Sequence, residues 1–529
     1  MSNAKKYIFL FGILIIATFF RFYHFTTTPP GLYPDEAIDG NNAAEAAQTG
    51  QFKVFYTEDN GREGLYVNII AVILKEFPIY KPWIIRLPAA IAGVLTVLGI
   101  YFLAAELFTE REKEKEERKK VLNPDEKISR RNISYLISHI SYLNSTIALL
   151  AAFFLATSFW HINFSRIGFR AILAPLLLVW SLYFLIKALR AVSPRAATLY
   201  AAIAGIIYGL GFYTYIAYRI TPLLFLLFIP FFGKGKDFWK RVLVFVILVL
   251  ITAAPIGYYF LKHPADFFGR TAQISVTNAA SPVRDFAVNI AKVALMFNFH
   301  GDLNWRHNIS GAPELFWPVG ILFVLGIVLG LCSLWKSGRS KTMREDSQNL
   351  LPTFPLLLIF SWIILAGIPA AASDEGIPHA LRSILMLPPA MLFAAIGGVW
   401  LYQIMKEKMD KNFARIVAFI FILTVGIFGY VNYFVVWAQN PNVPGSFNSN
   451  YVTIGNEINA LPTGTPKYVI INAGGVMTRG FPMPAETTMF ITNSFLPDDA
   501  AVKNIHYLLP DASNTIPAGT PSSTIFEIN

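Results

Sequence analysis

The chain has 529 residues, of which 54% are hydrophobic and only 15% are charged, and its mean hydropathy is +0.48. Soluble domains carry about 25% charged residues, so this composition excludes a water-facing globule and predicts an all-α membrane protein that crosses the bilayer many times. The net charge of +11 does not indicate nucleic-acid binding, because the basic residues cluster in short segments between apolar runs.

Eleven apolar segments approach the length of about 20 residues that a helix needs to cross the hydrocarbon layer. Residues 64–80 are also apolar, but Lys75, Glu76 and Pro78 interrupt them, so we expect a helix that lies at the interface. The first span lacks a small-residue cleavage site after it and is expected to be retained. The predicted spans are roughly 7–23, 87–108, 142–160, 171–190, 197–215, 217–232, 241–261, 315–335, 353–372, 383–402 and 413–437.

Basic residues set the expected orientation. With a cytoplasmic N-terminus, more than half of the 44 Lys and Arg residues fall in cytoplasmic segments, including the mixed-charge run 110–120, which we expect to be a solvated helix end. The positive-inside rule therefore predicts a multi-pass plasma-membrane protein with this orientation. The external segments are then 24–86, 161–170, 262–314, 373–382 and the tail 438–529.

The tail is expected to form a domain of its own. It begins with a linker rich in Pro and Asn at 440–446. Beyond the linker we expect a helix over 450–461 and strands over 467–472, 488–491 and 523–528. We therefore predict a transmembrane part, 1–437, whose first external loop is 24–86, and a small extracytoplasmic α/β domain, 438–529.

The unusual polar residues outside the cytoplasmic loops all fall on the external side. Asp35 and Glu36 lie just beyond the first span, and two adjacent carboxylates are costly near hydrocarbon unless they have a function. Arginines that alternate with carboxylates at one membrane face suit a phosphate headgroup beside an acid/base centre. Besides Asp35 and Glu36, the candidate residues are Arg62, Glu63, Arg166, Arg170, Tyr215, Arg219, His300, Asp302, Arg306, Glu375, His379 and Arg382.

Each of these features also has a structural explanation. The pair Asp35-Glu36 could cap a helix that starts at residue 37. Arg166 and Arg170 are four apart, so on a helix they would share a face and could reach the interface. Arg86 is expected to pair with an acid of the first external loop. The acids at 374–375 could serve only to solvate their loop.

No cofactor is certain from the sequence, although a divalent metal ion is a candidate. His300 and His307 are seven residues apart and flank Asp302, and imidazole and carboxylate groups are common metal ligands. This spacing is not diagnostic of any metal site, so the metal ligands stay unknown.

The order of the short motifs resembles that of the GT-C superfamily of polyprenyl-phosphate-sugar-dependent glycosyltransferases, in the branch of the protein O-mannosyltransferases and aminoarabinose transferases. The resemblance covers residues 1–230 well and later parts mainly in topology. It rests on Asp35-Glu36 after the first span, on GREGLY at 61–66 in place of a K-P-P-L-Y stretch, on RLP at 86–88, and on Ser165-Arg166.

The resemblance implies an inverting sugar transfer from a polyprenyl-phosphate donor to a protein, lipid or polysaccharide acceptor on the extracytoplasmic face. It implies that Asp35 is the base, that Glu36 supports it, and that Arg62 takes the place of a lysine on the lipid phosphate. Because this loop departs from Lys-Pro-Pro, Arg166 and Arg170 are alternative phosphate ligands. The rival hypotheses are a multipass transporter, although no paired repeat is visible, and a non-catalytic lipid-glycan binding protein.

Overall fold

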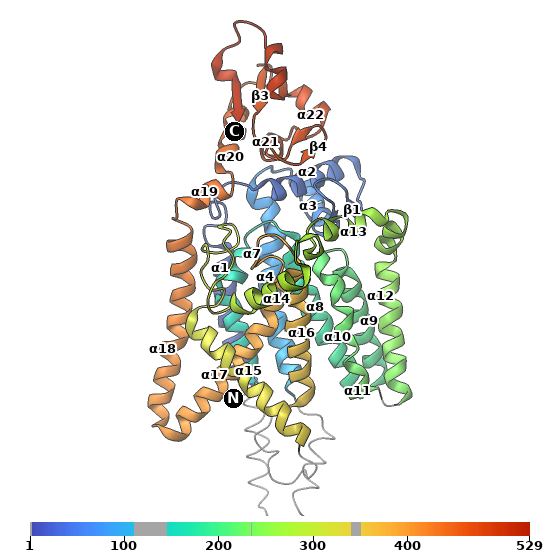
Figure 1. The fold of residues 1–529 in the computed structure, drawn as a ribbon, viewed down its shortest axis with the longest axis vertical. Coiled ribbons are helices and arrows are strands. Elements are labelled where there is room, and N and C mark those ends of the chain that lie inside the picture. Colours follow the sequence, from blue (N-terminus) through green and yellow to red (C-terminus); the bar gives the residue numbers. More distant parts are fainter. Residues whose placement is uncertain (1–2, 110–144, 234, 340–350) are drawn as a thin grey trace, which may run out of the picture.

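The structure is a computed structural model that describes residues 3–109, 145–233, 235–339 and 351–529. It consists mainly of long helices that run side by side, with the N-terminus at one end of the bundle and a small C-terminal unit beyond the other end (Figure 1). The predicted mixed-charge run at 110–120 lies outside the described residues.

The described residues contain seven helices that are long and apolar enough to cross a membrane. The other predicted spans correspond to α1 (Asn3–Phe22), α9 (Pro194–Gly211) and two shorter apolar stretches, Ser145–Thr157 and Ile216–Phe232. The polytopic helical fold is therefore confirmed, whereas the number of eleven spans stays a prediction. The seven are α4 (Pro82–Leu107), α8 (Leu173–Arg190) with the 3₁₀ turn η1 (Arg170–Ile172), α12 (Lys236–Lys262), α15 (Trp317–Arg339), α16 (Thr353–Ala371), α17 (Leu387–Lys408) with η5 (Ile384–Met386), and α18 (Lys411–Tyr430) with the π-helix η6 (Val431–Trp437).

Two of the predicted spans are not single helices. The helix over 145–157 ends before Ser158, and the short helix α7 (Phe159–Phe164) follows it. Residues 216–232 are divided into η2 (Ile216–Ile220), α10 (Pro222–Phe225) and α11 (Phe228–Phe232). Proline has no backbone N–H to donate to the preceding turn, and Pro222 accordingly starts a new helix.

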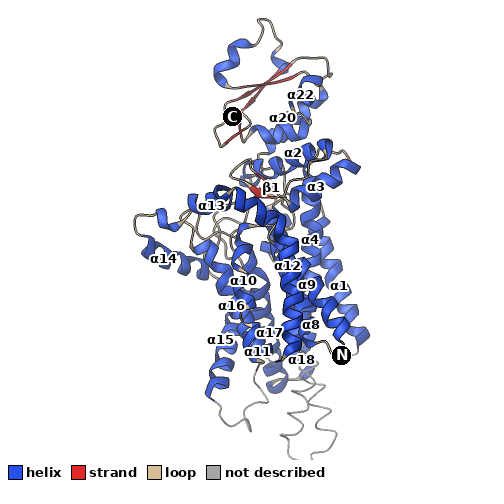
Figure 2. Cartoon of the chain, turned by 90° about the vertical axis from the view of Figure 1, so that its right-hand side faces the viewer, coloured by secondary structure: helices blue, strands red, loops and turns tan. Residues whose placement is uncertain are grey.

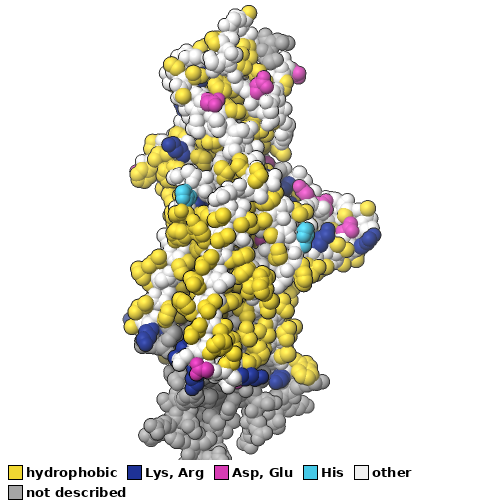
Figure 3. Space-filling model, turned by 90° about the vertical axis from the view of Figure 1, so that its left-hand side faces the viewer, with side chains coloured by type: hydrophobic (Ala, Val, Ile, Leu, Met, Phe, Trp, Pro, Cys, Tyr) yellow, Lys and Arg dark blue, Asp and Glu magenta, His cyan; other side chains and the backbone are white. Residues whose placement is uncertain are grey.

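The transmembrane helices form two groups. In the first, α1, α4, α8, α9 and α12 each pack against the next, and in the second α15, α16 and α18 pack around α17. Arg190 donates to the carbonyl of Leu107 (3.2 Å) and Arg241 to that of Leu189 (3.0 Å), so these helix ends lie together. Figure 3 shows the Lys and Arg side chains at this end, below a band of hydrophobic side chains.

The segment between α1 and α4 folds into α2 (Pro34–Thr49), the hairpin β1 (Phe55–Tyr56)–β2 (Arg62–Glu63), and α3 (Leu65–Glu76). The helix expected over 64–80 is present as α3, whose 12 residues are too few to cross a bilayer, and its place at the interface stays a prediction. The hairpin turns through Gly61, whose φ of +80° favours glycine, and it pairs Tyr56 with Arg62.

Loop 262–314 contains the helices α13 (Pro264–Gln273), η3 (Val276–Asn278) and α14 (Pro282–Leu295). Helix α14 packs against α16 and stands out sideways from the bundle at the level just below β1 (Figure 2). The loop then continues through 300–316 without regular structure before α15 begins.

The C-terminal unit contains a parallel three-stranded sheet in the order β6-β3-β7, formed by β3 (Lys467–Ile471), β6 (Ile505–Leu508) and β7 (Ile525–Ile528). The expected helix over 450–461 is confirmed as α20 (Ser449–Ala460), and the strands expected at 467–472 and 523–528 are confirmed as β3 and β7. The remaining elements are α19 (Asn442–Ser446), the hairpin β4 (Met477–Thr478)–β5 (Phe481–Pro482), α21 (Ala485–Thr492), α22 (Pro497–Val502), η7 (Pro510–Thr515) and η8 (Ser522–Thr524).

The strand predicted at 488–491 is wrong, because these residues lie in the buried helix α21. Helix α21 packs between α20 and α2, the helix that carries Asp35 and Glu36. Burial between two helices outweighs the strand preference of its Thr, Phe and Ile residues.

The C-terminal unit also has its own hydrophobic cluster, which includes Val469 and Ile528. The proposed domain boundary at 437/438 stays a prediction.

Candidate active site

The acidic pair lies in the first turn of α2, and Glu36 is fixed there by several donors. Its Oε2 accepts the N–H of Tyr33 (3.2 Å), which caps the helix. Arg86 donates to Glu36 from Nε (2.8 Å, to Oε1) and from Nη2 (2.9 Å, to Oε2), and the N–H of Gly168 donates to Oε1 at 2.7 Å. The predicted pairing of Arg86 with an acid of this loop is thus confirmed. The helix start expected at residue 37 is wrong, because α2 begins at Pro34 after the N-cap Tyr33, and Glu36 has its capping role as the third residue of the helix.

Asp35 differs from its neighbour. Within the described residues, no group donates a hydrogen bond to its carboxylate, and the side chain is only half-buried. Burial raises the pKa of Asp35 and the charge of Asp59 adds to the rise, whereas Arg62, Arg306 and Arg170 oppose it. Asp35 therefore presents a free carboxylate of increased basicity that is surrounded by arginines.

Arg62 is held by ion pairs within its own loop. Its Nη1 donates to Asp39 Oδ1 (2.9 Å) and to the backbone carbonyl of Asp35 (3.0 Å), and its Nη2 pairs with Asp59. Arg62 and Asp39 are both buried. These contacts leave Arg62 few donors for a lipid phosphate, the role that the sequence resemblance implies. Asp39 and Asp59, which were absent from the predicted site, are its partners.

Glu63 joins two arginines that come from distant segments. Its Oε2 accepts from Arg170 Nε (3.1 Å) and its Oε1 from Arg219 Nη2 (3.2 Å). Arg219 also donates to the carbonyl of Phe267 (2.7 Å). The terminal nitrogens of Arg170 donate no hydrogen bond in the described part of the chain, and its guanidinium lies 6.0 Å from the ring of Tyr215. Glu63 thus orients Arg170 without using all of its donors.

Arg166 holds the end of α1. It is fully buried and donates to four backbone carbonyls. It also lies against the rings of Tyr433 and Phe434. The expected shared face with Arg170 is absent, because α7 ends at Phe164 and the next turn begins only at Arg170. The four carbonyls belong to Phe20 (2.9 Å), Tyr23 (2.7 Å), His24 (3.2 Å) and Thr28 (2.8 Å).

Arg306 is a second arginine with unused donors. Its guanidinium carbon lies 3.6 Å from the centre of the Tyr33 ring, two residues before Asp35. Its side chain donates no hydrogen bond among the described residues, and its Nε is buried without a partner. Because Arg306 and Arg170 both act electrostatically on Asp35, the free carboxylate and these two guanidinium groups with unused donors belong to one site.

The histidines of loop 262–314 and segment 373–382 are arranged differently from the pattern expected from the sequence. Asp302 Oδ2 accepts from His307 Nδ1 (2.8 Å) and lies 3.8 Å from His379 Nδ1, whereas His300 is exposed and is not part of this group. The three residues could hold a metal ion. His379 replaces His300 as the second histidine, a pairing that sequence spacing could not reveal because the two segments are far apart in the chain.

Segment 374–382 lies at the edge of the site. Arg382 Nη1 donates to the backbone carbonyl of Glu375 at 2.6 Å, and Nη2 is 3.8 Å from the exposed Glu375 carboxylate. The charge of Arg382 acts on both Tyr215 and Asp302. Arg382 is therefore near both Asp302, which contacts the histidines, and the ring of Tyr215, which lies beside Arg170.

The C-terminal unit adds polar contacts that sequence reasoning missed, one buried (Asn41–Glu486) and the others exposed (Arg479). Asn41 Nδ2 donates to Glu486 Oε2 at 2.7 Å, and Arg479 Nη2 pairs with Glu45 (2.7 Å) and Glu58 (2.8 Å). Burial raises the pKa of Glu486 to about 7. These contacts join α21 and the β4–β5 hairpin to the loop that carries Asp35.

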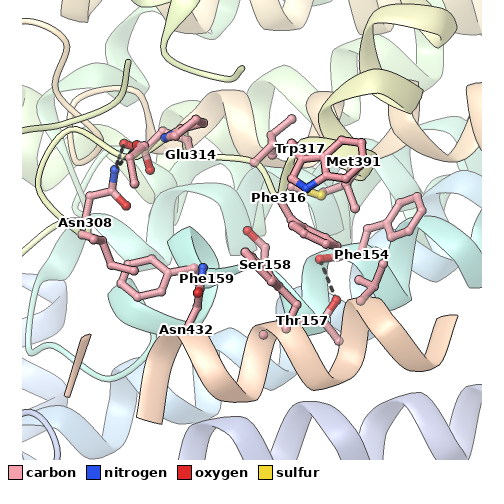
Figure 4. A pocket seen from close by; sticks show the side chains of 18 residues that line it. Phe154, Thr157, Ser158, Phe159, Asn308, Glu314, Phe316, Trp317, Met391 and Asn432 are labelled. Atoms are coloured by element: carbon pink, nitrogen blue, oxygen red, sulfur yellow. Dashed lines mark hydrogen bonds between the residues drawn. The ribbon is translucent and has the colours of Figure 1, made fainter. Parts of the chain in front are cut away.

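A cavity of about 150 Å³ lies on the other side of loop 300–316, toward α15, α17 and α18. Figure 4 shows Glu314, Ser158 and Asn432 among its mainly apolar side chains. Glu314 Oε1 accepts the N–H of Asp302 at 3.0 Å. None of the predicted site residues lines this cavity, so it is separate from the cluster around Asp35.

No family model and no curated protein sequence matches the chain. Solved structures match its fold over almost the whole length. ArnT from Cupriavidus metallidurans bound to undecaprenyl phosphate is 13% identical with a TM-score of 0.53, and the match covers 96% of this chain and 90% of ArnT. The apo state of ArnT is 14% identical with a TM-score of 0.52, and the match covers 98% and 96% of the two chains.

An archaeal enzyme also shares the fold. The apo oligosaccharyltransferase of Archaeoglobus fulgidus is 12% identical with a TM-score of 0.50, and the match covers 93% of this chain and 64% of that chain. The chain therefore shares the fold of ArnT and of this oligosaccharyltransferase, which is the fold that the resemblance of the sequence implies.

Proposed function

We propose that the protein is an integral-membrane glycosyltransferase that moves a sugar from a polyprenyl-phosphate donor to an acceptor on the extracytoplasmic face. The observation that carries this proposal is the free carboxylate of Asp35 beside two arginines that retain unused donors, namely the terminal nitrogens of Arg170 and the guanidinium of Arg306. The shared fold supports it, because one of the matching structures, ArnT, holds undecaprenyl phosphate.

In the proposed reaction, Asp35 accepts the proton of the acceptor hydroxyl as that oxygen bonds to the anomeric carbon of the sugar. The bond from this carbon to the phosphate oxygen breaks, and polyprenyl phosphate leaves with an additional negative charge. Arg170 and Arg306 bind this charge more strongly as it develops, which lowers the barrier. Attack from the face opposite the phosphate inverts the configuration of the sugar.

The remaining residues support this centre. Glu36 and Arg86 fix the start of α2, and Glu63 orients Arg170. In the plasma membrane, the N-terminus would face the cytoplasm and the C-terminal domain would lie outside it. This orientation follows from the positive-inside rule, because the basic helix ends lie at the end of the bundle opposite the site. The acceptor is a hydroxyl of a protein, lipid or polysaccharide.

The experiment is to incubate the purified protein in detergent or vesicles with radiolabelled polyprenyl-phosphate sugars and a membrane extract that supplies protein, lipid and polysaccharide acceptors. We expect the release of free polyprenyl phosphate together with a labelled acceptor product. Movement of intact donor across the vesicle membrane without cleavage would instead support a transporter. Saturable binding with neither cleavage nor movement would support a lipid-glycan binding protein, and both outcomes would contradict the proposal.

A further inference from the structure

We propose that Asp302, His307 and His379 form a binding site for one divalent transition-metal ion of the Zn²⁺ class. Each residue offers one ligand atom, and these atoms all lie within 4.8 Å of one another. The two imidazole rings are 4.8 Å apart between their centres and inclined by 41°, so they converge on the carboxylate without stacking.

The carboxylate is positioned in advance by backbone groups. Asp302 Oδ1 accepts the N–H of Asn304 at 2.8 Å, and Oδ2 accepts the N–H of Ala380 at 2.8 Å. His307 is buried against the ring of Phe164, at 5.4 Å between ring centres. Partners of this kind orient the ligands of a metal ion and account for much of its affinity.

The type of donor decides the type of ion. Two imidazoles and one carboxylate are the ligands of Zn²⁺ and neighbouring transition metals, whereas Mg²⁺ and Ca²⁺ prefer all-oxygen sites. The ion would replace the hydrogen between His307 Nδ1 and Asp302 Oδ2, and that proton would move to Nε2 or to solvent. Three protein ligands leave a fourth position of a tetrahedral ion open.

The site would connect two external segments. Asp302 and His307 precede α15, whereas His379 lies between α16 and α17, so one ion would fasten the two loops together. Arg306 and Arg382 flank the ligands in the sequence, and the ion would therefore add positive charge at the edge of the candidate site. This inference stands whether or not the chain transfers a sugar.

The test uses the full-length protein without a histidine tag, treated with a chelator, incubated with Zn²⁺ and freed of excess metal by gel filtration. Mass spectrometry of the elements should find about one Zn²⁺ per chain in the wild type. His379→Gln and the double variant His307→Ala/His379→Ala should lose it. His300→Ala is the matched control, because His300 is exposed on the same loop, and it should retain the ion.

Two further measurements keep the test independent of misfolding in the variants. Zn²⁺ should raise the Tm of the wild type and of His300→Ala, but not that of His379→Gln. Co²⁺ added to the wild type should give the visible absorption of a cobalt ion with nitrogen and oxygen ligands. A wild type that retains no more Zn²⁺ than the double variant, or that gives no such absorption, would overturn the proposal.

Discussion

Arg86 donates two hydrogen bonds to Glu36, from Nε at 2.8 Å and from Nη2 at 2.9 Å, and both side chains are buried. The adjacent Asp35 receives no such bond within the described residues. Two neighbouring carboxylates in the first turn of one helix therefore have different environments. We infer that Glu36 stabilises the fold and that Asp35 is available for chemistry.

Glu36→Gln should destabilise the protein, because it leaves the buried Arg86 without a counter-charge. Loss of one partner of a buried ion pair costs about 3–5 kcal/mol, so we expect a clear fall in the Tm of the detergent-solubilised protein. The double variant Glu36→Gln/Arg86→Met should recover part of this loss, since no unpaired charge remains. A double variant less stable than the sum of the two single variants would contradict a stabilising pair.

Arg170 and Arg166 should respond differently to replacement by alanine. Arg170→Ala should fold normally and lower kcat/KM for the donor by about 10- to 100-fold, the range for one charge-assisted hydrogen bond. Arg166→Ala should instead reduce the amount of folded protein, because four buried carbonyls lose their donor. Arg284→Ala, on the exposed face of α14, is the control and should change neither property. Wild-type kinetics in Arg170→Ala would exclude Arg170 from phosphate binding.

The rate of transfer should rise with pH as Asp35 loses its proton. Burial, with a contribution from Asp59, raises the pKa of Asp35, so the acid limb of kcat/KM should lie above the pH at which an ordinary aspartate titrates. Asp59→Asn should move this limb to lower pH, since one negative charge near Asp35 is removed. A limb that does not move in Asp59→Asn would argue against Asp35 as the titrating group.

Glu486→Gln should stabilise the protein at alkaline pH. The folded-state pKa of Glu486 is about 7, above its unfolded value of 4.5. At a pH between 4.5 and about 7, the folded protein therefore keeps this proton while the unfolded chain has lost it. The free energy of unfolding consequently falls as the pH rises through this range. At pH 8 the substitution should gain up to about 3 kcal/mol, at about 1.4 kcal/mol per pKa unit.

The gain in stability from Glu486→Gln should shrink toward pH 5, because the glutamic acid of the wild type is itself neutral in the folded state at that pH. Thermal melts of both proteins at pH 5 and pH 8 measure this difference. The glutamine can still accept the hydrogen bond of Asn41, so packing is retained. An equal Tm difference at both pH values would show that the effect is not caused by ionisation.

The sequence predicted the polytopic helical fold, the side of the bundle where the polar residues gather and the pairing of Arg86. These follow from local hydropathy and from charge counts, which a single sequence contains. It could not decide which arginines are free, because that depends on partners such as Asp59 for Arg62 and the carbonyls at the end of α1 for Arg166.

The misassigned strand at 488–491 and the missed His379 have a related cause. The Thr- and Ile-containing stretch forms α21 because α2 and α20 bury it from both sides, and no local pattern records those neighbours. Likewise, His307 meets His379 only because the segments that precede α15 and α17 fold against each other. Contacts between segments far apart in the chain decide both features.

The most direct test of the central claim is the turnover of Asp35→Asn with a polyprenyl-phosphate sugar, compared with Asp374→Asn, which removes an exposed carboxylate from the same face. The account predicts that Asp35→Asn accumulates in the membrane with a Tm close to that of the wild type but releases no polyprenyl phosphate above background. Asp374→Asn should turn over like the wild type. Wild-type turnover in Asp35→Asn would contradict the role of Asp35 as the base.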